Sequence, residues 1–130
     1  MFGCTDGSVC KVGLKTHHNK YVVAEKDGKA NANRDWMLSY EIFSVNFIGE
    51  DKVQFKGHQG KYLTAKPDGT VNANASWTLT HETWTVKNKG SGLAFKSYHG
   101  KYLSAKTDGT LNADVTWALE YETFKVIPVH

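Results

Sequence analysis

The chain has 130 residues, a formal net charge of +3 and a hydrophobic fraction of 40%. This length fits one domain with a hydrophobic core of its own, and the composition is that of a globular protein. The mild positive charge falls short of the concentrated basic stripe of nucleic-acid-binding proteins, so we expect no nucleic-acid partner. No apolar run approaches the length of a membrane span, so we expect no membrane insertion.

The N-terminal segment contains both cysteines. Residues 1–6 lack the basic and apolar regions of a signal peptide, which predicts a protein that is either cytoplasmic or secreted without a leader. Cys4 and Cys10 bracket an Asp-Gly pair, so a turn could bring them together in a disulfide. Because the cytosol keeps thiols reduced, we favour two free thiols.

Three blocks of the sequence repeat one another without gaps, at residues 12–45, 53–86 and 93–126. Twelve positions are identical in all three blocks, and the second and third blocks agree at 18 positions. Each block contains four short segments with strand character, with an Asp-Gly turn between the second and third. In the second block the predicted strands are 52–56, 61–66, 71–74 and 82–86, and residues 77–81 form a loop or a single tight turn.

Twelve short strands in three equal blocks predict an all-β fold. A propeller normally needs four or more blades, and an open solenoid needs capping repeats, so neither fits. A β-trefoil, with six barrel strands capped by three hairpins around a pseudo-threefold axis, uses every strand. We therefore predict one β-trefoil domain over residues 1–130, with the blocks as its lobes. The predicted inward residues are Leu14, Phe55, Phe95, Tyr21, Tyr62, Tyr102, Ala24, Ala65, Ala105, Leu38, Leu79, Leu119, Phe43, Trp84 and Phe124.

The second and third blocks carry a motif of known trefoils. Residues 55–65 (FKGHQGKYLTA) and 95–105 (FKSYHGKYLSA) resemble the signature of fascin-like trefoils, including hisactophilin. The first block departs from it at Asn19 and Val22. The resemblance implies the β-trefoil fold and binding to actin filaments.

No catalytic motif or metal-ligand spacing is present, so we expect no enzymatic activity, no catalytic residues, no metal and no cofactor. Six lysines also recur by block, at 15, 56 and 96 and at 20, 61 and 101. They form either a basic actin-binding surface or solvated strand ends whose stems cover apolar rings, and we favour the second interpretation.

Aromatic, amide, carboxylate and imidazole side chains also recur at fixed offsets in each block. A sugar stacks its C–H face on an aromatic ring and directs its hydroxyls to such polar groups. The alternative roles are structural: the Asn residues hold a turn, the Glu residues cap a loop and the Trp residues fill the bottom of the barrel. The candidate carbohydrate-binding residues are His18, Asn33, Trp36, Tyr40, Glu41, Gln59, Asn74, Trp77, His81, Glu82, His99, Asp114, Trp117, Tyr121 and Glu122.

Two functions follow from these features. The first is a lectin for cell-surface glycans, in particular galactose-containing glycolipids or glycoproteins, with shallow sites in one or more lobes. A homodimer would add avidity to such sites. The alternative is a protein that binds or bundles actin filaments, in the manner of fascin and hisactophilin. Of the two, we favour the lectin.

Overall fold

The computed structural model describes residues 2 and 10–129 of the chain. Over these residues each lobe has the same order of elements, with a single 3₁₀ turn between its third and fourth strands. Lobe 1 contains β1 Cys10–Lys15, β2 Tyr21–Ala24, β3 Ala30–Arg34, η1 Ser39–Glu41 and β4 Phe43–Ile48. Lobe 2 contains β5 Lys52–Lys56, β6 Tyr62–Ala65, β7 Val71–Ala75, η2 Thr80–Glu82 and β8 Trp84–Asn88. Lobe 3 contains β9 Leu93–Lys96, β10 Tyr102–Ala105, β11 Leu111–Val115, η3 Glu120–Glu122 and β12 Lys125–Pro128.

Six strands, the first and fourth of each lobe, form a ring. Antiparallel ladders join β12 to β1, β1 to β4, β4 to β5, β5 to β8 and β8 to β9. Between β9 and the start of β12 the contact is one bridge, Leu93 to Phe124, with backbone hydrogen bonds of 2.9 and 2.8 Å. The predicted ring is therefore present, but a single bridge replaces a continuous ladder at this sixth join.

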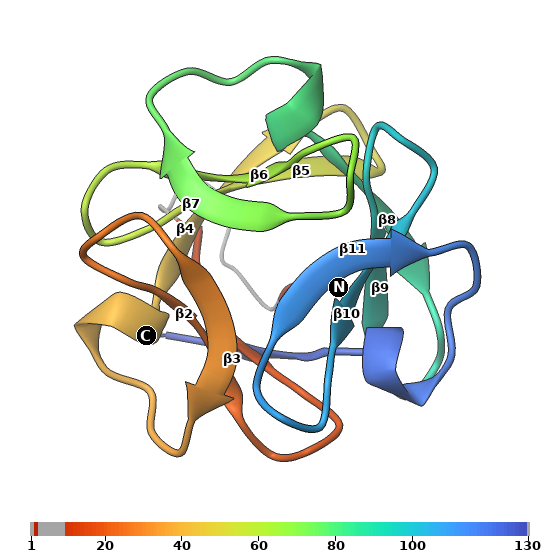
Figure 1. Ribbon diagram of the computed structural model, residues 1–130, viewed down its shortest axis with the longest axis horizontal. Helices are drawn as coiled ribbons and strands as arrows, with labels where there is room; N and C mark the ends of the chain where they lie inside the picture. The colour runs from red at the N-terminus through yellow and green to blue at the C-terminus, as the bar shows by residue number, and fades with distance from the viewer. Residues whose placement is uncertain (1, 3–9, 130) are drawn as a thin grey trace.

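The three remaining hairpins, β2–β3, β6–β7 and β10–β11, lie around the central axis in Figure 1. Their Asp-Gly turns interlock because each turn glycine accepts a backbone hydrogen bond from the third strand of another lobe. All three bonds are 2.8 Å long: Ala73 N–H to Gly28, Ala113 N–H to Gly69 and Ala32 N–H to Gly109. Six ring strands and three interlocked hairpins make the β-trefoil that the repeats predicted.

The core lies inside the ring and consists of large aromatic side chains from all three lobes. Phe55 contacts Phe43 and Phe95, with ring centroids 6.2 and 5.1 Å apart, and Phe95 contacts Phe124 at 5.9 Å. Most of the predicted inward residues are confirmed. Those fully or almost fully buried are Leu14, Ala24, Phe43, Phe55, Ala65, Trp84, Phe95, Ala105 and Phe124.

Two sets of predicted inward residues behave differently. Tyr21, Tyr62 and Tyr102 are only half-buried. The leucines were wrong, because they are 64 to 67% exposed. Each leucine precedes a 3₁₀ turn in an extended conformation, with its N–H bonded to a buried glutamate, so its side chain faces solvent. These exposed leucines are Leu38, Leu79 and Leu119.

The cysteine prediction concerns residues at the edge of the described region. Cys10 is buried and disulfide-bonded, so the favoured free thiol is wrong for this residue. Cys4 lies outside the described residues. None of the helices in the described part of the chain is long and apolar enough to span a membrane.

Candidate functional site

The three repeated glutamates support the fold from the interior. Glu82 is 3% exposed, and its Oε1 accepts the Leu79 N–H at 2.8 Å. Its Oε2 accepts the Thr64 hydroxyl at 2.5 Å. Glu122 has the same two partners in lobe 3, the Leu119 N–H at 2.9 Å and the Ser104 hydroxyl at 2.6 Å. Each of these buried carboxylates thus caps its 3₁₀ turn, which is the structural role that the sequence offered as the alternative.

In lobe 1, different residues surround the buried glutamate. Glu41 accepts the Leu38 N–H at 2.7 Å, but Val23 occupies the position of Thr64 and offers no hydroxyl. Arg34 approaches instead, with Nε 4.0 Å from Glu41 Oε2, while its Nη2 pairs with Glu25 at 2.7 Å. An arginine thus balances the buried charge where the hydroxyl is absent.

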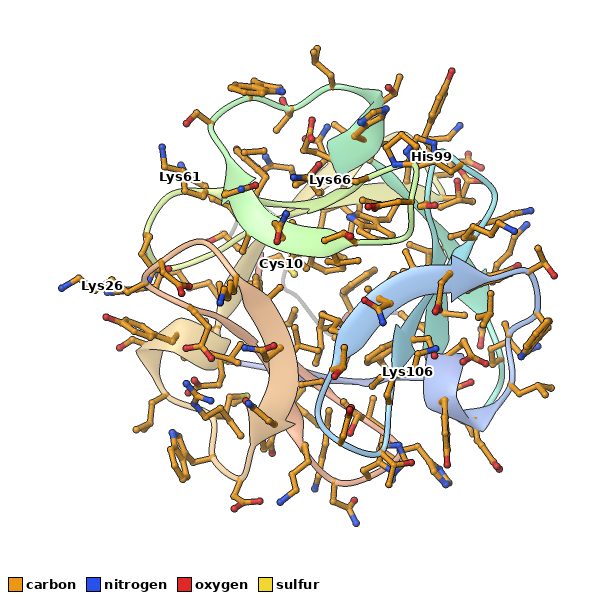
Figure 2. All side chains as sticks on the ribbon, in the orientation of Figure 1. Cys10, Lys26, Lys61, Lys66, His99 and Lys106 are labelled. Atoms are coloured by element: carbon orange, nitrogen blue, oxygen red, sulfur yellow. The ribbon has the colours of Figure 1, made fainter. Side chains whose placement is uncertain are left out.

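The aromatic residue of each 3₁₀ turn contacts the first loop of the next lobe. Tyr40 lies 5.6 Å from His58, and His81 lies 4.5 Å from His99, measured between ring centroids. Figure 2 shows His99 beside the η2 turn. In the third interface, Tyr121 lies 4.6 Å from His18. These predicted residues therefore meet between lobes, whereas the sequence placed each set within one lobe.

The middle residue of each first loop reaches further into the neighbouring lobe. His18 Nε2 lies 3.2 Å from the Ala105 carbonyl oxygen, and His99 Nε2 lies 3.1 Å from that of Ala65. Gln59 takes this position in lobe 2, where its buried Nε2 has no hydrogen-bond partner within the described structure. The two histidines thus join neighbouring lobes.

The candidate side chains on the third strands, Asn33, Asn74 and Asp114, lie at the interlocked hairpins. A Cβ on Gly109 would come within 2.7 Å of the Asn33 Cβ, and a Cβ on Gly69 within 3.1 Å of the Asp114 Cβ. Asn33 accepts a hydrogen bond from Arg34 at 2.7 Å, and Asp114 forms an ion pair with Lys106, just after β10, at 3.0 Å. In lobe 2, Asn74 lies in the same way against Gly28.

The repeated tryptophans lie on the surface. Trp36, Trp77 and Trp117 are 52, 61 and 55% exposed, so the alternative role of filling the bottom of the barrel was wrong. Each follows the third strand, in a segment that leaves the sheet before the 3₁₀ turn. Within the described residues, none of the three indoles takes part in a ring pair. In each lobe the indole thus lies at the surface, whereas the glutamate of the same candidate set lies in the interior.

Three surface grooves lie instead at the lobe boundaries. Each is lined by the 3₁₀-turn segment of one lobe and the first loop of the next. We name them by their lobes. The lobe 2–3 groove has a volume of about 950 Å³, against about 440 Å³ for the lobe 3–1 groove and about 510 Å³ for the lobe 1–2 groove.

The lobe 2–3 groove combines apolar, hydroxyl and cationic side chains. Leu79, Ile48 and Tyr98 are 67, 46 and 64% exposed and supply the large apolar surfaces. Four threonines and a serine add hydroxyls, three lysines add positive charge, and none of its lining residues is a carboxylate. The lining lysines are Lys52, Lys87 and Lys96.

Hydrogen bonds fix one wall of this groove. Buried Gln54 donates from Nε2 to the Thr83 hydroxyl at 3.0 Å, and that hydroxyl donates to the Leu79 carbonyl oxygen at 2.9 Å. In the opposite wall the first loop closes by a 2.7 Å bond from the Ser97 N–H to the Lys101 carbonyl. The groove is thus held in shape before any partner arrives.

The repeats contain a signal for this groove that the prediction overlooked. Tyr98 aligns with His17 and His58, and Leu79 aligns with Leu38 and Leu119, yet alignment compares positions within a lobe. Residues that meet across a boundary sit at different offsets of successive blocks, so they do not stand out in an alignment.

The described residues contain no group of three or more His, Cys, Asp or Glu side chains placed to hold a metal ion. A comparison with curated proteins finds no match. The sequence pattern of the Fascin domain matches residues 17–126, which include almost all of the three lobes. The repeats, the trefoil and this match agree, and the chain belongs to the fascin-domain family.

Proposed function

We propose that this protein binds actin filaments. The observation that carries the proposal is the Fascin-domain match over residues 17–126, because the resemblance to fascin-like trefoils implies binding to actin filaments. A family match identifies the fold more firmly than the partner, so the surface must also suit the partner.

The distribution of lysines supports this choice. Three of them stand over tyrosine rings at equivalent positions, with Nζ to ring-centroid distances of 5.8, 6.0 and 5.8 Å for Lys15, Lys56 and Lys96. Figure 2 shows Lys26 and Lys61 extending from the rim of the molecule. Lysines held at the surface are suited to contact carboxylates on a partner protein.

The structure gives less support to the lectin. Glu82 and Glu122 are buried and bonded to hydroxyl groups, and His18 and His99 each have one ring nitrogen at a carbonyl oxygen of another lobe, so these side chains are less available to a sugar. The candidates that stay exposed in each lobe include an indole with an amide or carboxylate three residues before it.

Cosedimentation with actin filaments tests the proposal. We expect the protein to pellet with filaments in a saturable manner, and we expect the pelleted fraction to fall as salt screens the lysines. Protein that stays in the supernatant at low salt, over filament concentrations up to about 100 µM, corresponding to roughly 5 kcal/mol of binding free energy, would contradict it.

Carbohydrate binding remains a second candidate because of one observation. The three indoles are more than half exposed at equivalent positions, and an exposed aromatic face is what a sugar ring stacks on. Tryptophan fluorescence titrated with galactose-containing oligosaccharides measures this directly. A saturable change would favour the lectin, and an unchanged spectrum together with filament binding would remove it.

A further inference from the structure

The three grooves are related by the threefold repeat, but they differ in chemistry. The position of Ile48 in the lobe 2–3 groove is taken by Lys89 in the lobe 3–1 groove and by Val129 in the lobe 1–2 groove. The lobe 3–1 groove also contains a carboxylate, Glu120, and has less than half the volume. The repeats therefore leave one groove that is both larger and more apolar.

Exposed apolar side chains of this size at one place mark an interaction surface. Leu79, Ile48 and Tyr98 line the groove together, and the hydrogen bonds of Gln54 and Thr83 hold the Leu79 segment in place. A partner that covers these side chains removes apolar surface from water on both sides of the contact.

The charge of the groove indicates the kind of partner. Lys52 and Lys87 are exposed, and neither forms an ion pair within the described structure. The acidic residues nearest in sequence, Glu50 and Asp51, lie outside the lining. An acidic partner segment would therefore find cations there without competition from a lining carboxylate.

We infer that the lobe 2–3 groove binds an acidic protein segment that also presents apolar side chains. Its apolar groups cover Leu79, Ile48 and Tyr98, and its carboxylates meet Lys52 and Lys87. That this segment belongs to the actin filament rests on the proposed function. The chemistry of the groove stands on the lining residues alone.

Matched variants test the inference. Leu79→Ser removes the apolar contact of the groove, and Leu119→Ser is its control, because the two leucines are 67 and 64% exposed at equivalent positions. The double variant Lys52→Glu/Lys87→Glu reverses the charge, and Lys89→Glu/Lys125→Glu makes the same change in net charge around the lobe 3–1 groove. All of these side chains are exposed, so thermal unfolding should confirm that every variant folds.

The variants are compared on actin filaments and on a soluble glutamate–tyrosine copolymer, which has the chemistry of the partner without its identity. We expect Leu79→Ser and Lys52→Glu/Lys87→Glu to weaken binding to both probes about tenfold or more, and each control to change it less than about twofold. If variant and control affect binding to both probes equally, the inference that this groove binds the segment is wrong. If the protein binds the copolymer through the groove but does not bind filaments, the inference about the groove holds and the proposed function is wrong.

Discussion

Single residues explain how three similar lobes are held together without being identical. His18 and His99 each reach a carbonyl oxygen of a neighbouring lobe, whereas Gln59 leaves a buried donor without a partner within the described structure. A buried polar atom without a hydrogen bond costs about 1–3 kcal/mol. The interface between lobes 1 and 2 should therefore be the one that a single substitution improves most.

Replacing Gln59 by histidine should raise the free energy of unfolding by about 1 kcal/mol, because the imidazole makes the bond seen at the other two interfaces. Urea denaturation measures the change. The reverse substitution, His99→Gln, is the control and should lower stability. If Gln59→His is neutral or destabilising, the unpaired amide is not a weakness of the fold.

The buried glutamates give a second test at this scale. Thr64→Val removes the hydroxyl that donates to Glu82, and should cost about 1–3 kcal/mol because one carboxylate oxygen is left unpaired. Ala75 occupies the position that Arg34 has in lobe 1. Adding Ala75→Arg should recover part of the lost stability, because an arginine would then approach the buried glutamate as in lobe 1. A double variant no more stable than Thr64→Val would refute this account.

At the scale of elements, the Asp-Gly turns both close the hairpins and join the lobes. Gly109 has a φ of +91°, and a Cβ there would lie 2.7 Å from the Asn33 Cβ. Gly90 has a similar φ of +82°, but nothing lies within 4 Å of its added Cβ. The pair separates the cost of the backbone conformation from the cost of the close contact.

Gly90→Ala should therefore cost about 1 kcal/mol, for the left-handed conformation alone. Gly109→Ala should cost about 1–3 kcal/mol more, because the added methyl must displace the third strand of lobe 1. Chemical denaturation of both variants against wild type gives the two values. Equal losses would show that the interlocking of hairpins adds little to stability.

The same turns should make stability depend on pH. The backbone N–H and hydroxyl of Thr70 hold the pKa of Asp68 below the ordinary value, and the hydroxyl and N–H of Thr110 do the same for Asp108. A pKa lowered by folding stabilises the protein above the unfolded-state value, and this contribution is lost as the pH falls through the folded value. The window therefore lies below about pH 4.

Thermal unfolding of wild type and of the Asp68→Ala/Asp108→Ala double variant checks this sign. We expect wild type to unfold at a higher temperature near neutral pH, and we expect the gap to narrow as the solution is acidified below about pH 4. A gap that stays constant down to low pH would mean that the charged carboxylates do not contribute.

For the whole molecule, much of the fold could be predicted from the sequence. Each repeat contains short segments in which apolar and polar residues alternate, as they do in strands. Phe55 has buried apolar counterparts in the other two lobes, Leu14 and Phe95, and the Asp-Gly pairs mark the hairpins. The leucines were misplaced because an apolar side chain repeated three times is typical of a core. Only the structure shows that a buried glutamate holds the backbone of Leu79 and turns its side chain to solvent.

The candidate site was harder to predict for a physical reason. The sequence grouped residues that are close along the chain, such as Trp77 with Glu82. In the structure, Trp77 lies at the surface and Glu82 in the interior. The groups that share a groove, such as Leu79 and Tyr98, come from different lobes. Their proximity depends on how lobes pack, and a repeat pattern describes each lobe by itself.

The central proposal is that this trefoil binds actin filaments, with its lobe 2–3 groove toward the filament. Electron cryomicroscopy of filaments mixed with the protein tests both parts at once. We predict one trefoil along the filament surface for each binding site, with Leu79, Ile48 and Tyr98 at the contact. Bare filaments at saturating protein, or a trefoil attached by another face, would contradict the account.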